Sequence, residues 1–395
     1  MSRTDEARAA ATLAARASYG RLVAILAAPT HDLAGAEDAL ADAFERALRT
    51  WPEAGVPDNP EAWLLTVARN RVRDTLRSAA RRTAAPLEEA TTVVADVLDV
   101  DVDAIGDRRL ELLFACAHPR VDPLVRATLM LQVVLGLDAR RIGQAFAVPG
   151  ATMAQRLVRA KRRIKGVAIP FAVPTRADMA VRLPPVLEAV YGAYAVDFPW
   201  ASPLADEARY LALTTADLLG DEPEAWGLAG LLTLSLARAP ARDAEEYVPL
   251  DEQDPASWDA ALISEGEALL RRASSLGRPG RFQLEAAVQS VHCDRARTGR
   301  TDWAALRRLY TGLVAVAPTL GARTALAVAT GRVDGPSAGL AVLDAIDDPA
   351  VRRFQPAWAA RAELSRDPAS YAKAISLTTD PRVRRWLERR AARPA

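Results

Sequence analysis

Four polar side chains recur at helical spacing in the segment 138–165, which mixes apolar and basic residues. The segment predicts a helix over Asp138–Ala147, a tight turn at 148–150 that contains proline and glycine, and a second helix from Ala151. One face of the second helix carries, at i, i+3, i+4 and i+7, Thr152, Gln155, Arg156 and Arg159. Arg and Gln pair with base edges in the major groove of DNA, and a hydroxyl reaches a phosphate. This face therefore predicts a DNA-reading helix.

A basic tail and an apolar stripe complete this second helix. The tail suits the sugar–phosphate backbone and consists of Lys161, Arg162, Arg163 and Lys165. The stripe, at i, i+4, i+7 and i+11, should be buried against the first helix, and consists of Met153, Leu157, Ala160 and Ile164. A helical hairpin whose basic face is merely solvated has the same pattern, so the segment alone leaves both interpretations open.

A second basic helix is predicted upstream, over Glu61–Arg82. Its arginines are Arg69, Arg71, Arg73, Arg77, Arg81 and Arg82. One purely apolar stripe should be buried, namely Leu64, Ala68, Val72 and Leu76. The neighbouring stripe carries Trp63, Val67, Asn70, Asp74 and Arg77. Polar groups beside a tryptophan and among arginines suit a nucleic-acid backbone with exposed bases. The alternative is a solvated helix on which Asn70 and Asp74 pair with nearby arginines.

Acidic residues gather in two other segments. A helix predicted from Leu33 has an acidic outer side of Glu37, Asp38, Asp42 and Glu45. Its inward positions should be Leu33, Leu40, Phe44, Ala47 and Leu48. The acidic side suits either solvent or a basic partner. The segment 86–107 has no Lys or Arg and predicts a linker, which could occupy a cationic channel in place of nucleic acid or serve as a plain tether.

The composition bounds the fold class. The chain has 395 residues, of which 50% are hydrophobic and 6% aromatic, with Ala, Leu and Val dominant. This mixture favours helices over sheets, and the length suits two or three domains, so we expect an all-α fold. The formal net charge of +1 hides local clusters of both signs and does not argue against nucleic acid.

Enzymes, metal proteins and membrane proteins have signatures that this sequence lacks. No Gly-rich phosphate loop occurs, and none of the three histidines has a recognisable spacing from a nucleophile: His31, His118 and His292. We therefore expect no enzyme and no cofactor. Cys116 and Cys293 are too few for a disulfide framework and lack the paired spacing of a zinc site. The N-terminus lacks a signal-peptide core, and the longest apolar run is too short to span a bilayer, so we expect a cytoplasmic protein without a membrane partner.

Three blocks in this order resemble an RNA polymerase sigma factor of the extracytoplasmic-function group. AEDALADAFERAL, from Ala36, is similar to the helix with which those factors grip the polymerase. AWLLTVARNRVRD, from Ala62, resembles the helix that opens and reads the minus-ten promoter element. ATMAQRLVRAKRRI, from Ala151, is like their recognition helix for the minus-thirty-five element. One block is a weak pattern, but three in order over the first 165 residues are a strong one.

The resemblance implies roles for particular residues. Contact with core RNA polymerase would fall to Glu37, Asp38, Asp42, Phe44 and Glu45. Contact with the minus-ten DNA would fall to Trp63, Arg69, Asn70, Arg73, Asp74 and Arg77. Contact with the minus-thirty-five DNA would fall to Thr152, Gln155, Arg156, Arg159, Lys161 and Arg162.

The remainder of the chain predicts helices separated by Pro, Gly and Asp. It is similar to the subgroup of these factors that carries a long helical, tetratricopeptide-like C-terminal extension, with segments such as Val248–Ala273. Two departures are the stretch Ala193–Phe198, where the subgroup has Asn-Glu-Gly-Tyr, and the lack of an asparagine near Arg323. Short Ala-rich helices suit a helix-pair solenoid that binds peptides or proteins, and an irregular all-α domain fits equally well.

The expected organisation has four parts. A polymerase and minus-ten domain spans 1–85, the acidic linker 86–107, a helix–turn–helix domain 108–170, and a regulatory helical domain 171–395. The expected function is to direct core RNA polymerase to specific promoter DNA and start transcription, with the C-terminal domain modulating activity through a protein or small-molecule regulator. The alternative is a free-standing helix–turn–helix regulator with a helical sensor domain, which would not need the Glu61–Arg82 helix.

Overall fold

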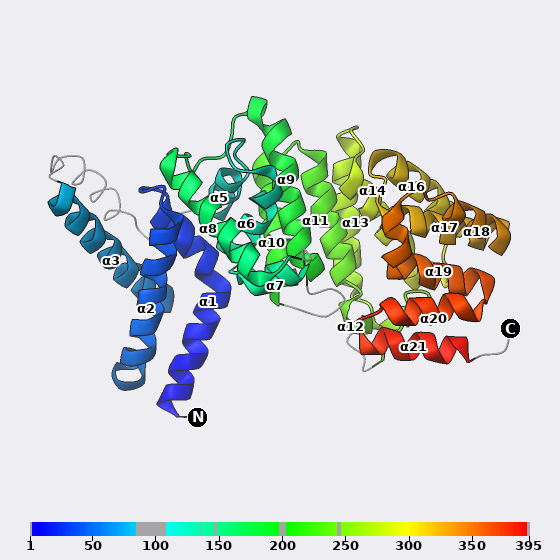
Figure 1. The fold of residues 1–395 in the computed structure, drawn as a ribbon, viewed down its shortest axis with the longest axis horizontal. Coiled ribbons are helices and arrows are strands. Elements are labelled where there is room, and N and C mark those ends of the chain that lie inside the picture. The colour runs from blue at the N-terminus through cyan, green and yellow to red at the C-terminus, as the bar shows by residue number, and fades with distance from the viewer. Residues whose placement is uncertain are drawn as a thin grey trace. The chain divides into compact units, whose positions relative to one another are not determined.

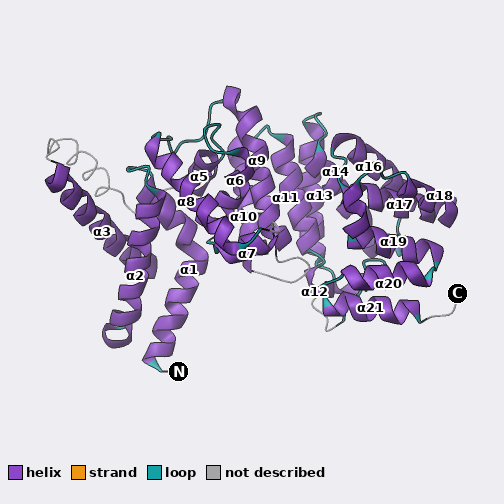
Figure 2. Ribbon diagram, in the orientation of Figure 1, coloured by secondary structure: helices purple, strands orange, loops and turns teal. Residues whose placement is uncertain are grey.

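Figure 1 shows the computed structural model of the chain, which describes residues 2–83, 108–134, 136–145, 148–196, 203–242 and 246–392. Within these ranges every regular element is an α-helix or a short 3-10 helix, and no strand occurs (Figure 2). The all-α expectation is therefore confirmed. The predicted linker 86–107 lies outside the described residues. None of the described helices combines the length and the apolarity that crossing a bilayer requires.

The chain divides into two compact units, residues 1–196 and 197–395. The first unit contains α1 (Arg3–Ala27), α2 (Leu33–Ala54), α3 (Pro60–Thr83), α5 (Arg109–Cys116), α6 (Pro123–Val133), α7 (Ala139–Ala145), α8 (Gly150–Gly166) and α9 (Arg176–Val196). It extends past residue 170 because α9 packs on α5 and α6. The buried guanidinium of Arg182 on α9 donates a hydrogen bond to the carbonyl of Phe114 on α5. The segments predicted as two DNA-facing domains thus share one compact unit.

Side-chain caps set the starts of the first helices. The Ser2 hydroxyl accepts from the Asp5 amide at 3.1 Å, and the Asp5 carboxylate accepts from the Ser2 amide at 3.2 Å, which together form a capping box for α1. The Asp32 carboxylate accepts from the Gly35 amide at 3.1 Å at the start of α2. The Asn59 side chain accepts from the Ala62 amide at 3.0 Å at the start of α3. These short polar residues satisfy amides that have no partner within the helix, so the breaks between helices follow directly from the sequence.

Helices α1, α2 and α3 pack against one another around a leucine-rich core. Its fully buried side chains include Leu22, Leu33, Leu40, Leu64 and Leu65. An ionic contact joins the first and third helices, because the Glu61 carboxylate accepts from the Ser18 hydroxyl at 3.0 Å and pairs with Arg21 at 3.2 Å. Three helices that bury one another's apolar faces make a firm support for the charged side chains outside them.

One sequence expectation for α2 is wrong. Leu48 was expected to face inward but is 47% exposed, because the neighbouring Ala47 takes the buried position and adjacent helical residues point about 100° apart. The helix runs past Trp51 and Pro52 to Ala54 and stops at Gly55, which has φ +89°. Pro52 has no amide to donate to the carbonyl four residues earlier, so the helix lacks one hydrogen bond shortly before it ends.

The second unit is a succession of helices. They are α10 (Pro203–Leu219), α11 (Pro223–Leu236), α12 (Ala239–Arg242), α13 (Ala260–Ser275), α14 (Arg281–Cys293), α15 (Arg295–Thr298), α16 (Trp303–Val316), α17 (Leu320–Asp334), α18 (Pro336–Asp344), α19 (Gln355–Ser365), α20 (Pro368–Leu377) and α21 (Pro381–Ala391), with 3-10 helices at Pro255–Ser257 and Pro349–Arg353. Helix α11 is almost entirely buried among α10, α13 and α14. From α16 onward, each helix packs mainly on its neighbours in the sequence. The final helix, α21, is rich in arginine and buries Leu387.

Arginines from distant helices hold the segment 246–254 in the second unit. The buried guanidinium of Arg295 donates to the carbonyl of Leu250 at 2.7 Å and to that of Gln253. Further along the segment, ion pairs join Asp251 to Arg332 at 3.0 Å, Glu246 to Arg389 at 3.0 Å, and Glu252 to Arg390. These contacts join α15, α17 and α21 to the segment 246–254, although the three helices are far from it in the sequence.

A glycine in α1 is required for the packing of the first unit. A Cβ on Gly20 would lie 1.9 Å from the backbone carbonyl oxygen of Val134 at the end of α6. We expect Gly20→Ala to lower the free energy of unfolding of this unit by about 1–3 kcal/mol, because α1 and α6 must move apart. Pulse proteolysis in urea, with peptides of the first unit followed by mass spectrometry, measures the change.

The matched control is Gly166→Ala. Nothing lies within 4 Å of a Cβ built on Gly166, and this residue ends α8. Alanine there should be neutral or stabilise by a few tenths of a kcal/mol, since it restricts the unfolded chain. Equal stability of the two variants would contradict the close approach at Gly20.

Candidate nucleic-acid interface

Helix α8 presents a buried stripe and a basic exposed face, as the sequence predicts. The stripe of Met153, Leu157, Ala160 and Ile164 is buried. Exposed to solvent on the other sides are Thr152, Gln155, Arg156, Arg159, Arg162 and Arg163. The apolar stripe fixes the rotation of the helix, so the sequence pattern alone decides which of its side chains meet solvent.

A close approach to the preceding helix positions α8. The Asp138 carboxylate accepts from the Arg141 amide at 2.8 Å and caps α7, and Ile142 is fully buried. A Cβ on Gly143 would lie 2.5 Å from the carbonyl oxygen of Val148, whose amide donates to the Gly143 carbonyl at 2.8 Å. The α7–α8 pair is therefore a tight helix–turn–helix in which glycine is needed at the turn. The end of the first predicted helix, Phe146-Ala147, lies outside the described residues.

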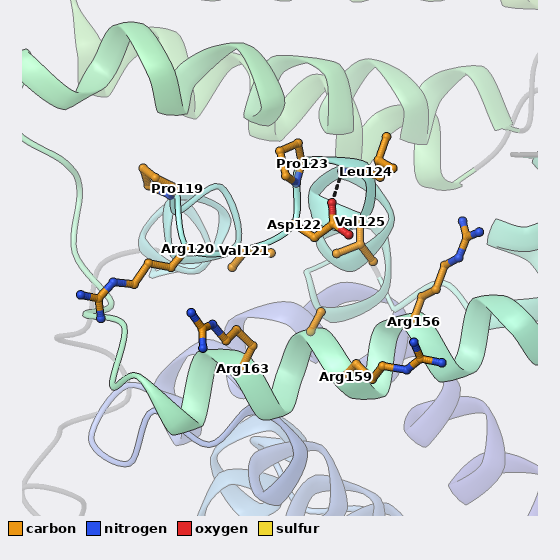
Figure 3. Close-up of a pocket in the computed structure, with 11 residues that line it drawn as sticks. Pro119, Arg120, Val121, Asp122, Pro123, Leu124, Val125, Arg156, Arg159 and Arg163 are labelled. Carbon is orange, nitrogen blue, oxygen red and sulfur yellow. Dashed lines mark hydrogen bonds between the residues drawn. The ribbon is translucent and has the colours of Figure 1, made fainter.

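A cleft of about 560 Å³ runs beside α8 and is lined by arginines. Its walls are α8, the loop 119–122 and the start of α6, and its basic residues are Arg120, Arg156, Arg159 and Arg163. Figure 3 shows Arg120 and Arg163 at one end of the cleft, and Arg156 and Arg159 at the other. Guanidinium groups spread along one groove suit a polyanion with regularly spaced phosphates.

A buried arginine holds the loop that forms the far wall. The guanidinium of Arg126 donates to the carbonyl of Val121 at 3.0 Å and to that of Pro119 at 3.2 Å, and Arg126 is only 9% exposed. The Arg120 amide donates to Nδ1 of His118 at 3.1 Å in the same loop. The sequence analysis missed Arg120 and Arg126, although an arginine inside the apolar run LVRATLMLQV was a signal that a buried cation organises this loop.

The electrostatics of the loop agree with its basic surroundings. Burial lowers the pKa of His118, and the nearby charges of Arg182, Arg120 and Arg126 lower it further, although Asp178 acts in the opposite direction. The imidazole consequently stays neutral at physiological pH. The three arginine charges around this imidazole also favour an anion over a cation at the loop.

The second predicted DNA-facing helix, α3, carries its polar residues on the outside. Asn70, Asp74 and Arg77 are exposed. Trp63 is partly buried, and its ring is edge-on to the ring of Trp51, with the ring centroids 5.4 Å apart. Arg69 and Arg73 are partly buried, and burial lowers the pKa of Arg69. Trp63 therefore lies at the boundary between the core and the polar surface, where one ring edge packs while the rest of the side chain can meet a ligand.

The residues predicted for polymerase contact differ in their exposure on α2. Asp38, Asp42 and Glu45 are exposed, and Phe44 is partly buried. Asp42 also pairs with Arg71 of α3 at 2.6 Å. Two further carboxylates of this region face α8. Lys161 Nζ lies 2.6 Å from Glu37 Oε2, and Lys165 pairs with Asp32. The structure thus brings together Glu37 and Lys161, which the sequence assigned to different partners.

Comparisons with known proteins bear on these surfaces. Residues 15–82 match the family described as sigma-70 region 2, and residues 182–274 match a family of unknown function, DUF6596. The chain is 36% identical over 327 residues to an uncharacterized protein of Rhizobium meliloti (strain 1021). The aligned region covers 79% of this chain and 77% of that protein. No solved structure matches the chain.

These matches fall on the elements described above. The sigma-70 region 2 match covers about half of α1, all of α2 and nearly all of α3. The outer faces of α2 and α3 carry the acidic and arginine-rich residues. The DUF6596 match runs from α9 to α13 and follows the helix–turn–helix pair. The chain belongs to the family of the Rhizobium meliloti protein, and its region 2 match indicates a sigma-70 family factor, a kind of protein involved in promoter recognition.

Proposed function

We propose that this protein directs core RNA polymerase to specific promoters and starts transcription there. The observation that carries the proposal is the sigma-70 region 2 match over 15–82, in one compact unit with a basic helix–turn–helix pair. In this proposal α2 binds polymerase, α3 reads the minus-ten element, and α8 reads the minus-thirty-five element. A free-standing regulator would have no use for a region 2, so the region 2 match favours the polymerase subunit.

Helix α8 is suited to reading duplex DNA. Arg156, Arg159 and Gln155 lie on its exposed face, where they can pair with guanine or adenine edges in an intact major groove. Thr152 lies in the first turn of the helix, where hydroxyls and backbone amides commonly contact phosphate. Arg120 across the cleft then meets the sugar–phosphate backbone and fixes the orientation of the helix.

Helix α3 is suited to a strand that has been opened. Its arginines hold phosphates, and Trp63 with Asn70 supports an unstacked base of the minus-ten element. Extruding a base costs a few kcal/mol, which the binding of the exposed strand must offset. The ion pair between Arg71 and Asp42 links this helix to α2, so that polymerase bound on α2 and DNA bound on α3 share one rigid support.

Two finer assignments belong to the same proposal. The order of the three blocks supports placing the chain in the extracytoplasmic-function group, and the second unit is proposed to be a tetratricopeptide-like array that modulates activity. The pair α19–α20 supports the latter, because the two helices pack on each other across a two-residue turn. Arrays of helix pairs present extended surfaces for peptides or proteins.

The role of Arg156 can be tested by transcription. Arg156→Ala should reduce run-off transcription from a cognate promoter about 5- to 150-fold, since a good base contact contributes about 1–3 kcal/mol of discrimination. Binding to core polymerase, measured by pulldown, should be unchanged, because Arg156 lies on α8 and not on α2.

The control is Arg8→Ala, which removes the same charge from an exposed position on α1. It should transcribe normally. If Arg156→Ala lost polymerase binding instead, the division of roles would be wrong, and if the wild-type chain shifted its promoter fully without polymerase, the regulator alternative would be right.

A salt titration tests the cleft. Arg163→Ala, like Arg120→Ala, should weaken binding of the holoenzyme to promoter and non-promoter duplexes alike. It should also reduce the slope of log affinity against log salt by about 1, because one phosphate contact is lost. Arg8→Ala should keep the wild-type slope. An unchanged slope in both cleft variants would remove the cleft from the DNA interface.

Removal of the second unit tests whether it regulates. The cut belongs after Val196, where the first compact unit ends, and not near residue 170, because α9 contributes Arg182 to the first unit. Run-off transcription by residues 1–196 should rise if the second unit restrains the first, and fall if it supports it. Identical yields from the short and full-length chains across salt and temperature would make the second unit a passive appendage.

A further inference from the structure

We propose that the basic flank of α8 is an internal ligand for the acidic face of α2, and that it must leave before α2 binds core polymerase. The inference rests on the proposed function, because it takes α2 as the polymerase-binding helix. The contact consists of Glu37 and Asp32 on the α2 side and Lys161 and Lys165 on α8, and we call it the α2–α8 clasp. It makes the first unit self-occluding.

The pair at the centre of the clasp is largely removed from water. Lys161 Nζ lies 2.6 Å from Glu37 Oε2, and the two side chains are 12% and 14% exposed. The hydroxyl of Tyr19 on α1 donates to the other carboxylate oxygen of Glu37 at 3.5 Å. Burial raises the pKa of Tyr19 above its usual range, and the charge of Glu37 adds to the effect. Glu37 is therefore engaged on both oxygens, and a partner protein cannot reach it while the clasp is closed.

The clasp continues on both sides of this pair. Lys165 reaches Asp32, which also caps α2, so the start of α2 and the end of α8 are joined. Beyond α8, the ring of Phe171 lies 5.8 Å from the ring of His31, in the turn that connects α1 to α2. Ile169 is 1% exposed and Phe171 is 8% exposed. Two ion pairs and one aromatic contact in a row form an extended interface between these segments, more specific than a single ion pair.

The clasp uses a flank of α8 that the DNA cleft does not use. Lys161 and Lys165 are one helical turn apart and face α2, whereas Arg156, Arg159 and Arg163 line the cleft (Figure 3). The buried stripe separates the two flanks around the helix axis. A closed clasp therefore covers Glu37 and Asp32 at the start of α2, and it leaves Asp38, Asp42 and the arginines of α8 exposed.

Charge complementarity identifies the competing partner. A surface that binds the acidic face of α2 must itself be basic, and the lysines of α8 supply that chemistry from within the chain. The proposed partner is consequently a basic surface of core polymerase, which has to displace Lys161 and Lys165. The apparent affinity for polymerase then equals the affinity of the open form multiplied by the fraction of molecules in which the clasp is open.

The test removes the clasp without adding charge to α2. The double variant Lys161→Met, Lys165→Met keeps the aliphatic stems and removes the two ammonium groups from the full-length chain. Hydrogen–deuterium exchange of the free protein should increase together in residues 33–40 and 157–165. Its affinity for core polymerase, measured without DNA, should rise about tenfold, which corresponds to about 1.4 kcal/mol of clasp stability.

A charge swap guards against simple unfolding. Lys161→Glu alone should open the clasp by repulsion from Glu37, and Glu37→Lys combined with Lys161→Glu should restore the slow exchange of both segments, because the pair is re-formed with reversed polarity. Arg8→Met is the control for loss of positive charge in the same unit and should leave both exchange and affinity as in the wild type.

The outcomes separate the clasp from the function on which it rests. Unchanged exchange in the Lys161→Met, Lys165→Met variant overturns the clasp, and so does faster exchange with an unchanged affinity for polymerase. If neither the wild type nor this variant binds polymerase, the proposed function fails, while the exchange data and the charge swap still decide whether the two helices hold each other.

Discussion

Close packing of helices at small residues is the constraint on which the rest of this structure depends. The chain is half hydrophobic but only 6% aromatic, so its cores are built from Ala, Leu and Val with glycine at the tightest crossings. At Gly20, Gly143 and Gly227, a Cβ would meet the backbone of another segment at less than 3 Å. Such crossings leave little freedom to shift, because the opposing atoms are backbone. The functional side chains are therefore carried on rigid helices and reach outward from them.

Within that framework, long arginine side chains act in two distinct ways. Some are buried and donate hydrogen bonds to backbone carbonyl groups. Arg126 holds the loop that lines the cleft beside α8, Arg182 joins α9 to α5, and Arg295 holds the segment 246–254. Others are exposed along a groove, such as Arg156 and Arg159 on α8. A chain whose net charge is nearly zero can therefore present a strongly basic surface, because its positive and negative side chains lie in different places.

Helix α8 illustrates how one element can serve three surroundings. Its apolar stripe is buried in the first unit, one flank lines the cleft, and the other flank meets α2 through Lys161 and Lys165. Three surroundings on one helix follow from its period of 3.6 residues, which distributes neighbouring residues around the axis. In such an arrangement, the flank that lines the cleft stays exposed while the other flank contacts α2.

Local patterns in the chain were enough to predict the helices, the buried stripe of α8 and the exposed face that carries Arg156, because periodicity and caps act over a few residues. The resemblance of the blocks from Ala36 and Ala62 to sigma factors also indicated what the region 2 match over 15–82 supports. Local patterns could not place Leu48 outside the core, identify Arg126 as the support of the cleft, or pair Glu37 with Lys161, 124 positions away. Those outcomes depend on which helices meet in space, and such meetings are settled by the summed burial of many side chains, which no short stretch of sequence contains.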